Sequence, residues 1–482
     1  MSQSPSIMIT DNDHPLHVAI IGAGISGLAT AFFIRKLSPN SRVALFEKDA
    51  RCGGTMQSED RDGFLFEAGP NGFLSNRQET LDLVQESGAE RLLLSSNDEA
   101  RIRYIFTDGL ERLPDTPPAF LRTKLLSLRD KLRVLGEVLT PPKKDDSDES
   151  LQAFGYRRLG RAFTDIFLDA MSAGIHASTP ERLSVNAAFP AIVRLEREYG
   201  GLFKGMIKKR RKEAGPGGVL MSFQGGVGAF ARHLADTLMN DSPPVAVYAS
   251  TRVTKLEREG AGYRLTVEGP ETESGSRTTR ELWAESVILA TPAYESAKLL
   301  NSLAPNIADR LRAIPYSPIA VVGFGFDNLD HPLGGFGLLT TTKARQKILG
   351  ILWDSSIFSG RAPADKQLLR VLIGGQRNPE LAFYDEPALI ALAQEGIEQT
   401  MGVKTPPATV FVKRWERGIP NYRLGHPANV RDIHQGLDAY PGLLLNSNAY
   451  FGIGINDCVI NSLACARRWA NGYGGVDSSD GD

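Results

Sequence analysis

Apolar residues along this chain gather in short runs, and glycine-rich or charged segments separate the runs. The first run, Val18–Ile21, is apolar throughout, which predicts a buried strand of a parallel sheet. Leu28–Lys36 then has the pattern of a helix, and Arg42–Phe46 predicts a second strand. Strand, helix and strand in this order predict the βαβ unit of an α/β domain.

Three glycines with the spacing G-x-G-x-x-G join the first strand to the helix, at Gly22, Gly24 and Gly27. In a dinucleotide-binding unit the first permits a tight turn, the second lets a pyrophosphate approach the backbone, and the third lets helix and strand pack closely. Glu47 ends the second strand, twenty residues after Gly27, where an acidic side chain would bind ribose hydroxyls. A glycine-rich turn without a ligand would not account for the position of Glu47, so we predict a dinucleotide site.

The remaining pattern predicts an α/β fold (α+β overall) with three domains. Strands return at Arg252–Leu256, Tyr263–Val267 and Ser286–Ala290, and they would complete a Rossmann-like domain. A mixed-sheet substrate domain and a helical domain account for the rest. The predicted bounds are 15–95, 215–305 and 410–475 for the discontinuous nucleotide-binding domain, 96–214 for the helical domain, 306–409 for the substrate domain, and 1–14 and 473–482 for disordered tails.

Composition excludes several classes of function. The 482 residues suffice for two or three domains, and a net charge of −1 argues against a nucleic-acid partner. Cys52, Cys458 and Cys465 have neither the spacing of metal ligands nor that of a disulfide framework, which favours a reducing compartment and no metal site. The first sixteen residues do not resemble a secretory signal, and no stretch predicts a membrane span. We therefore expect a cytoplasmic protein.

A basic run, Lys208–Lys212, ends a predicted helix of the helical domain. Such a run is usually a solvated helix face, and contact with anionic lipid headgroups is the alternative. Peripheral association with the inner face of the cell membrane therefore stays open.

A second glycine pair, Gly53–Gly54, follows Glu47 closely. This pair is unusual for a nicotinamide enzyme, and it is the pattern of FAD-binding flavoproteins that resemble amine oxidases; a plain turn is the alternative. Near the end of the chain, a glycine loop around Gly454 opens a helix that runs to Trp469. The N-terminus of that helix can point at the N1–C2=O edge of a flavin, which gains negative charge on reduction.

From about residue 16 to residue 472 the sequence resembles the oxygen-dependent protoporphyrinogen and coproporphyrinogen oxidases of haem biosynthesis, within the monoamine-oxidase-like flavoproteins. The resemblance rests on the glycine motifs with Glu47, on the segment Leu183–Met206, and on the closing motif Ala449–Cys458. Two residues depart from the family pattern: Asn456 stands in place of a proline, and Asn421 in place of a glutamine. Neither change removes a reactive group.

The resemblance implies FAD as cofactor, bound largely by backbone groups of the glycine loops and of residues 69–72. The implied FAD contacts are Gly22, Ala23, Gly24, Ile25, Ser26, Gly27, Glu47, Lys48, Arg51, Gly54, Thr55, Gly69, Pro70, Asn71, Gly72, Val253, Trp415, Ile453, Gly454 and Ile455.

It also implies that a flat tetrapyrrole lies between apolar side chains, here Leu339, Leu352 and Leu372, although ordinary core positions would explain these leucines equally from sequence alone. An arginine of the family pairs with a substrate propionate; Arg101 is the first choice and Arg103 the second. Asn71 offers an amide where substrate meets flavin, with a simple turn role as the alternative. No catalytic residue is assigned, because the flavin carries the chemistry.

The implied reaction converts protoporphyrinogen IX to protoporphyrin IX in three two-electron steps, with dioxygen as acceptor and hydrogen peroxide as product. The same chemistry on coproporphyrinogen III, another amine-oxidase-like activity, and a non-catalytic binding protein of the same fold are the alternatives. A homodimer and transfer of product to a ferrochelatase are further partner expectations.

Overall fold

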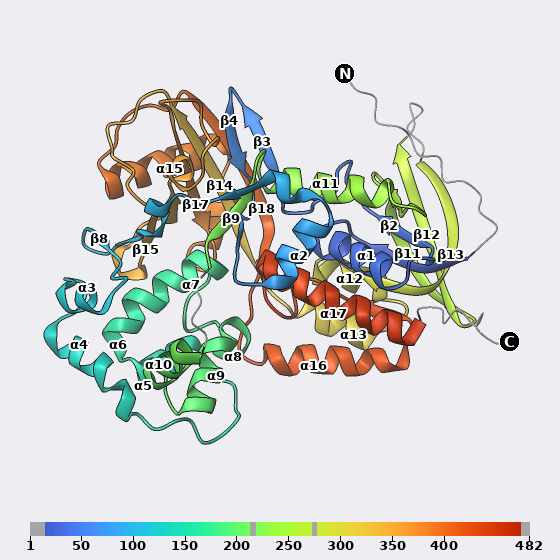
Figure 1. The fold of residues 1–482 in the computed structure, drawn as a ribbon, viewed down its shortest axis with the longest axis horizontal. Coiled ribbons are helices and arrows are strands. Elements are labelled where there is room, and N and C mark those ends of the chain that lie inside the picture. The colour runs from blue at the N-terminus through green and yellow to red at the C-terminus, as the bar shows by residue number, and fades with distance from the viewer. Residues whose placement is uncertain (1–14, 213–217, 272–276, 474–482) are drawn as a thin grey trace.

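The computed structural model describes residues 15–212, 218–271 and 277–473, which form two large sheets with their helices and a separate group of helices (Figure 1). The tail predicted at residues 1–14 and residues 474–482 of the other tail lie outside the described residues. Tyr473, which the prediction assigned to the second tail, is the last residue of a long helix.

The first sheet contains the predicted βαβ unit. Its strand order is β10-β2-β1-β13-β12-β11, and β19 also pairs with β13. Pairing is parallel among β10, β2, β1, β13 and β19, and antiparallel from β13 through β12 to β11. The strands are β1 (Leu16–Ile21), β2 (Val43–Phe46), β10 (Ala246–Tyr248), β11 (Arg252–Glu259), β12 (Gly262–Glu271), β13 (Arg277–Leu289) and β19 (Leu443–Leu445).

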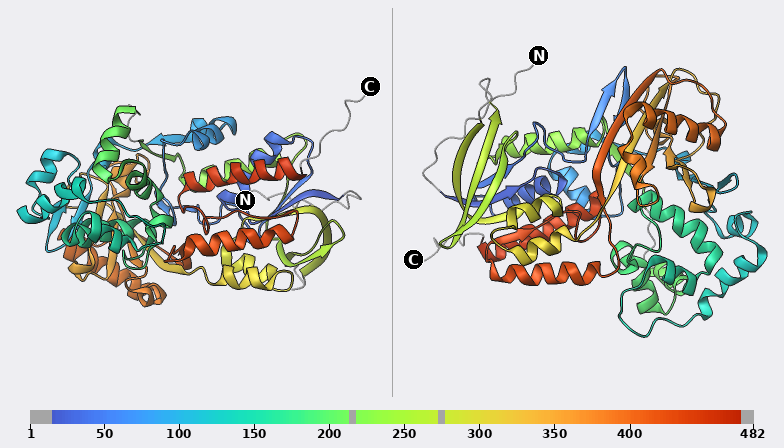
Figure 2. Two further views of the ribbon diagram at one scale, coloured as in Figure 1. Left: turned by 90° about the horizontal axis from the view of Figure 1, so that it is seen from below. Right: turned by 180° about the vertical axis from the view of Figure 1, so that it is seen from behind.

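Helices cover both faces of this sheet because its central strands are apolar on both sides. Val18 and Ile20 of β1 pack in one core with α1 (Ile25–Leu37), α11 (Val227–Met239) and α17 (Ile455–Tyr473). Ala19 and Ile21 pack in the opposite core with α12 (Ala293–Leu300), α13 (Pro305–Arg312) and α16 (His426–Gly436). Figure 2 shows α16 and α17 on opposite sides of the sheet. The predicted Rossmann-like fold is therefore confirmed.

The second sheet has the order β18-β14-β17-β16-β15-β7-β8, and α15 (Glu386–Met401) packs on one of its faces. Its strands are β7 (Tyr104–Phe106), β8 (Leu110–Arg112), β14 (Tyr316–Phe326), β15 (Gly337–Thr340), β16 (Ile348–Leu352), β17 (Gln367–Gly374) and β18 (Thr409–Pro420). Two pieces differ from the predicted domain bounds: β7–β8 fall in the predicted helical domain and β18 in the predicted nucleotide domain. They join this sheet because they complete its edges by backbone pairing. The domain division as a whole stays a prediction.

Two small sheets and one helix lie between the large sheets (Figure 1). They comprise β3 (Ser58–Arg61) with β4 (Phe64–Glu67), the order β5 (Phe73–Leu74), β9 (Leu220–Phe223) and β6 (Leu93–Ser95), and α2 (Gln78–Glu86). After β16 the short α14 (Asp354–Ile357) leads toward β17.

The helical region comprises α3 (Pro117–Arg122), α4 (Leu128–Leu135), α5 (Leu151–Arg158), α6 (Arg161–Phe163), α7 (Asp169–His176), α8 (Val185–Ala188), α9 (Pro190–Tyr199) and α10 (Leu202–Lys212). Its core holds a fully buried ion pair between Arg158 and Glu137. Within the three described ranges, none of the helices combines the length and hydrophobicity that crossing a bilayer requires.

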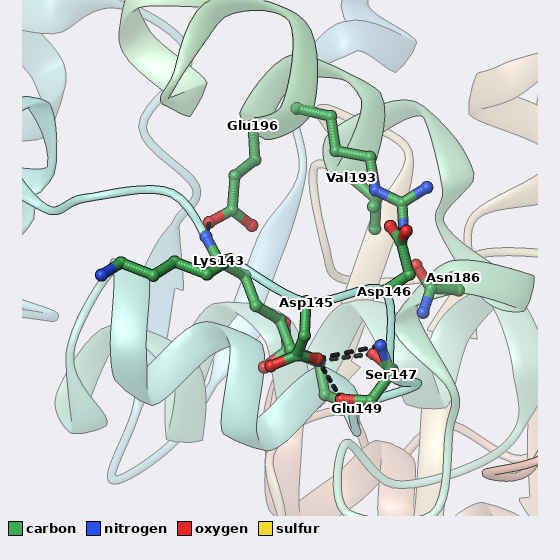
Figure 3. A pocket seen from close by; sticks show the side chains of 10 residues that line it. Lys143, Asp145, Asp146, Ser147, Glu149, Asn186, Val193 and Glu196 are labelled. Carbon is green, nitrogen blue, oxygen red and sulfur yellow. Dashed lines mark hydrogen bonds and ion pairs between the residues drawn. The ribbon is translucent and has the colours of Figure 1, made fainter.

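The charged segment before α5 is anchored to the helices. The Lys143 N–H donates to Oε1 of Glu196 on α9 at 2.9 Å, and Glu149 pairs with Arg157 at 2.7 Å. Figure 3 shows side chains that line a hollow beside this loop, with Asp145 bonded to Ser147. The hollow has a volume of about 60 Å³. Side chains of both charge signs line the hollow, and they pair with one another, which gives the loop a structural role.

Candidate active site

The two glycine loops pack against each other at the carboxyl ends of β1 and β2. Gly22 has a φ of +101°, and a Cβ on Gly27 would lie 1.9 Å from the carbonyl oxygen of Gly22. A Cβ on Gly54 would lie 3.2 Å from the Cα of Gly24. Glycine is therefore required at the turn and at the helix contact. These glycines form a tight turn that leads into the N-terminus of α1, and a turn of this kind can bind a pyrophosphate through its backbone N–H groups.

Glu47 follows the last residue of β2 directly, and only 7% of its surface is exposed. Its Oε2 accepts the Ala23 N–H at 2.9 Å, and its Oε1 accepts the Asp49 N–H at 3.0 Å. The carboxylate thus ties the first glycine loop to the second. The Thr251 N–H donates to the carbonyl of Glu47 at 2.7 Å, so the start of β11, where Val253 is buried, lies beside it.

The two basic residues predicted here point to different places. Lys48 is exposed and pairs with Asp49 at 3.1 Å. The Arg51 guanidinium donates to the carbonyl oxygen of Gly54 at 3.1 Å, and burial lowers its pKa. Arg51 also lines an open hollow of about 190 Å³, together with Arg232 of α11 among others. This part of the second glycine loop therefore carries positive charge next to the pyrophosphate loop.

The segment 67–72, called the 67–72 loop below, starts at the last residue of β4 and contains residues 69–72, which were predicted to contact the flavin. The surrounding backbone holds this loop closely. A Cβ on Gly69 would lie 2.2 Å from the carbonyl oxygen of Thr55, and one on Gly72 would lie 2.0 Å from a carbonyl oxygen of β9. The Trp415 Nε1–H donates to the carbonyl of Ala68 at 2.7 Å. These contacts bring Trp415, from β18, to the same loop.

Asn71 is the chemically informative residue of this loop. Its Nδ2 and Oδ1 atoms are both buried, and neither has a hydrogen-bond partner among the described residues. Leaving a buried polar group unpaired costs about 1–3 kcal/mol, so proteins rarely tolerate two on one side chain without a ligand. The amide is therefore available to a cofactor or substrate, and a turn role alone does not explain its burial.

The three leucines predicted to contact substrate lie on one face of the second sheet. Leu339 pairs with Gly350, and Gly350 pairs with Leu372, while Leu352 lies two residues along β16 on the same face. All three are partly exposed, whereas the alternate positions of these strands are buried under α15. A Cβ on Gly174 of α7 would lie 2.8 Å from Leu339. The face is thus apolar and only partly covered.

The candidate propionate arginines have different surroundings. Arg101 is exposed and lies 3.5 Å from the Asp98 carboxylate. Arg103 is exposed overall, but its guanidinium lies over the Phe336 ring, 5.1 Å from the centroid, and burial there lowers its pKa. Phe336 and Leu352 pack against the same small core, and Arg103 forms no ion pair within the described residues. The geometry therefore favours Arg103 over Arg101.

The closing motif opens α17. Ile453 and Gly454 precede the helix, and Ile455 is its first residue. The Gly454 N–H donates to Oδ2 of Asp457 at 3.1 Å, and burial raises the pKa of Asp457. Asn456, the departure from the family's proline, donates through Nδ2 to the carbonyl of Leu74 at 2.8 Å. The asparagine thus ties the start of this helix to β5.

The sequence analysis missed a buried network of four charges behind the 67–72 loop. Glu67 lies 3.1 Å from Arg361, and Arg370 lies 2.9 Å from Asp354. All four side chains are at most 2% exposed. Burial raises the pKa of Glu67 and lowers that of Arg361, and the mutual attraction of the pair opposes both shifts. One signal was available, since Arg370 is the sole charge in the apolar run Leu368–Ile373.

The family model "Flavin containing amine oxidoreductase" matches residues 25–469, so the chain belongs to this family. It is 27% identical to the coproporphyrinogen III oxidase of Bacillus subtilis, over 93% of this chain and 96% of that protein. It is 28% identical to the mitochondrial protoporphyrinogen oxidase of Nicotiana tabacum, over 93% and 94%. A solved structure from Exiguobacterium sp. 255-15, provisionally named a protoporphyrinogen oxidase, has a TM-score of 0.80 at 25% identity and covers 94% of this chain and 98% of that chain.

The cofactor of this family is FAD, and the residues of this chain fit it. The glycine positions that no Cβ could occupy, and the unpaired amide of Asn71, are features that a bound dinucleotide would use. The contact set predicted from the sequence stays a prediction, residue by residue.

Proposed function

We propose that this protein oxidises protoporphyrinogen IX to protoporphyrin IX with dioxygen. Three O2 molecules would accept six electrons and six protons, and three H2O2 molecules would leave. The observation that carries the proposal is the similarity along nearly the whole chain to proteins named porphyrinogen oxidases. The partly exposed leucine face beside the Asn71 loop supports it, because it suits a flat apolar substrate next to a flavin.

FAD, when bound, supplies the two-electron chemistry and passes electrons to dioxygen. The chain's own residues bind and orient. The glycine loops and Glu47 would hold the nucleotide half, and the 67–72 loop with Trp415 would hold the ring half. Leu339, Leu352 and Leu372 would exclude water from the substrate. Arg103 would pair with one propionate, where a charge-assisted contact contributes on the order of 1.5–3 kcal/mol.

The second candidate substrate is coproporphyrinogen III, and a specific observation favours it. The Bacillus subtilis and Staphylococcus aureus relatives, at 27% and 26% identity, bear the name coproporphyrinogen III oxidase. Coproporphyrinogen carries four carboxylates where protoporphyrinogen carries two, so a pocket for it needs additional cations. Turnover of the two substrates by the same protein can therefore be compared directly.

The test is turnover of both porphyrinogens under air, followed by porphyrin fluorescence and peroxide release. Faster turnover of protoporphyrinogen supports the main proposal, and faster turnover of coproporphyrinogen supports the second. A flavin-loaded protein that oxidises neither would refute both and would favour another amine-oxidase-like activity. A protein that cannot bind FAD would favour a binding role.

Variants at the two arginines test the substrate contact. Arg103→Ala should raise KM about tenfold or more, because one charged contact to a carboxylate is lost. Arg101→Ala is the matched control and should leave KM within about twofold, since its guanidinium faces solvent and Asp98. The reverse result would reinstate Arg101, and unchanged KM in both would remove the propionate role from this segment.

We also infer a peripheral membrane contact, at a different surface from the basic run that suggested it. On α10 only Lys208 of that run has a described side chain, and it is exposed. Five strongly exposed leucines lie instead on α3, α4 and the turn after α4, at the edge of the helical region (Figure 1). They are Leu121, Leu128, Leu132, Leu135 and Leu139. Leu128, Leu132 and Leu135 follow the helical spacing of α4, so they share one face of that helix, and Leu139 ends the 3-10 turn that follows it.

Vesicle sedimentation tests this contact. Replacing Leu128, Leu132 and Leu139 together with serine should abolish binding to vesicles that contain phosphatidylglycerol. Leu37→Ser, at an exposed position of α1, is the control and should bind as the original protein does. Equal binding by both variants would refute the proposed surface.

Two further partner proposals accompany the function, a homodimer and transfer of the product to a ferrochelatase; we also propose a cytoplasmic location. Sedimentation equilibrium over a range of protein concentrations tests the dimer. Product transfer predicts that ferrochelatase activity depends on the concentration of this protein beyond the porphyrin it releases. A monomer at all concentrations, and no such dependence, would remove these two proposals.

A further inference from the structure

Arg370 occupies the border between the candidate substrate face and the candidate flavin loop. On β17 it lies two residues before Leu372 and two after Leu368, so the three side chains share a face of the second sheet. Leu368 packs with Phe66 of β4 in a small core under the loop, and Leu372 belongs to the partly exposed leucine face. A buried cation at this place is costly unless it is matched.

The guanidinium is matched on two sides. Its Nη1 donates to two main-chain carbonyls of the flavin loop, those of Glu67 at 2.9 Å and Gly69 at 3.0 Å. Its Nη2 donates to Oδ1 of Asp354 at 3.1 Å, and its Nε lies 2.9 Å from Oδ2 of the same carboxylate. Asp354 thus balances the positive charge of Arg370 and fixes the orientation of its guanidinium. The two carbonyls both accept from the same nitrogen of that guanidinium.

We propose that Arg370, held by Asp354, is a positioning residue for FAD, because it sets the position of the 67–72 loop. The two bonds from Nη1 fix the Glu67–Ala68 and Gly69–Pro70 peptide groups. These two groups flank the Ala68 carbonyl, which accepts the Trp415 indole N–H. Asn71 lies two residues after Gly69, so the bonds from Arg370 also set the position of its unpaired side-chain amide. The inference rests on FAD as the cofactor and on the proposed location of its ring at this loop, and not on the identity of the substrate.

A purely stabilising ion pair would behave differently from a positioning residue. An apolar pair of similar volume often replaces a buried ion pair without loss of stability. Such a replacement here would keep the packing but would remove both bonds to the loop carbonyls. Arg370→Met with Asp354→Leu therefore separates the two roles.

The matched control is a fully buried pair in another part of the fold, Arg158 with Glu137 in the helical region, where Arg158 also donates to a main-chain carbonyl, that of Thr140 at 2.9 Å. We expect the Arg370→Met/Asp354→Leu apoprotein to bind FAD at least tenfold more weakly than the original protein in a titration followed by flavin fluorescence. Arg158→Met/Glu137→Leu should bind FAD within about twofold of the original. Equal FAD affinity in the two double variants would overturn the proposal.

Two conservative variants keep the test decisive if a double variant does not fold. Arg370→Lys keeps the net charge but cannot span two carbonyls and a carboxylate, so FAD affinity should fall while the flavin midpoint potential stays unchanged. Asp354→Asn leaves an uncompensated cation, which should raise the midpoint potential by stabilising the reduced flavin. An unchanged or lower potential in Asp354→Asn would overturn the proposal. These readouts need only FAD, so they stand whether or not a porphyrinogen is oxidised.

Discussion

Replacing Asn71 with leucine should make the FAD-free protein more stable and the FAD-bound protein less active. In the structure both polar atoms of the Asn71 side chain are buried without partners, and each such group costs about 1–3 kcal/mol. Leucine has a similar shape and no polar atoms. Allowing for imperfect packing, we expect the free energy of unfolding of the apoprotein to rise by roughly 2 kcal/mol.

The assay is urea unfolding of apoprotein and holoprotein, paired with turnover under air. Asn71→Leu should shift the apoprotein midpoint upward, should reduce the additional stability that FAD gives, and should lower kcat/KM. Asn71→Asp is the control of opposite sign, because a carboxylate at the same place should destabilise the apoprotein. If Asn71→Leu lowers apoprotein stability, or leaves FAD binding and turnover unchanged, the amide is not a ligand group and the reasoning fails.

Two further predictions concern packing and pH. Gly27→Ala should yield protein with little bound flavin, measured as the ratio of absorbance near 450 nm to that at 280 nm, because its Cβ would lie 1.9 Å from the Gly22 carbonyl oxygen; normal flavin content would contradict this. Burial lowers the pKa of His176 and of His426 from the usual 6.5 to about 4. Between pH 6.5 and 4 the unfolded chain therefore binds protons that the folded chain does not. The free energy of unfolding keeps its full value above pH 6.5 and decreases as the pH falls through this window, by on the order of 3 kcal/mol for each histidine. His176→Phe should flatten the urea midpoint profile in that window, and an unchanged profile would refute the assignment.

The sequence predicted the nucleotide-binding unit well because its signals are local. Gly22, Gly27 and Glu47 lie within one βαβ unit, where a steric requirement and a fixed spacing determine the structure. The sheet to which an edge strand belongs was harder to predict, since β7 lies far in the chain from its partner β15. Pairing with a distant segment, rather than local propensity, determines which sheet such a strand joins.

The chemistry behind the loop was equally hard to foresee. Arg370 was visible as a charge within an apolar strand, but its partners Asp354 and the Glu67 carbonyl are separated from it by 16 and 303 positions in the chain. The choice between Arg101 and Arg103 likewise depended on which guanidinium lies over Phe336. Composition and spacing contain no information on such contacts, which arise only when the sheets are assembled.

The parallel ladder of the first sheet joins β1, β13 and β19, three segments spread from residue 16 to residue 445. The C-terminal helix then closes the same core, where Trp469 donates to Ser286 at 2.6 Å and Asn446 donates to Thr30 at 2.8 Å. A ribosome-bound chain consequently cannot complete this core until residues up to Trp469 have emerged. Nascent chains stalled before residue 443 should expose the apolar faces of β1 and α1 and should be bound by chaperones and degraded rapidly.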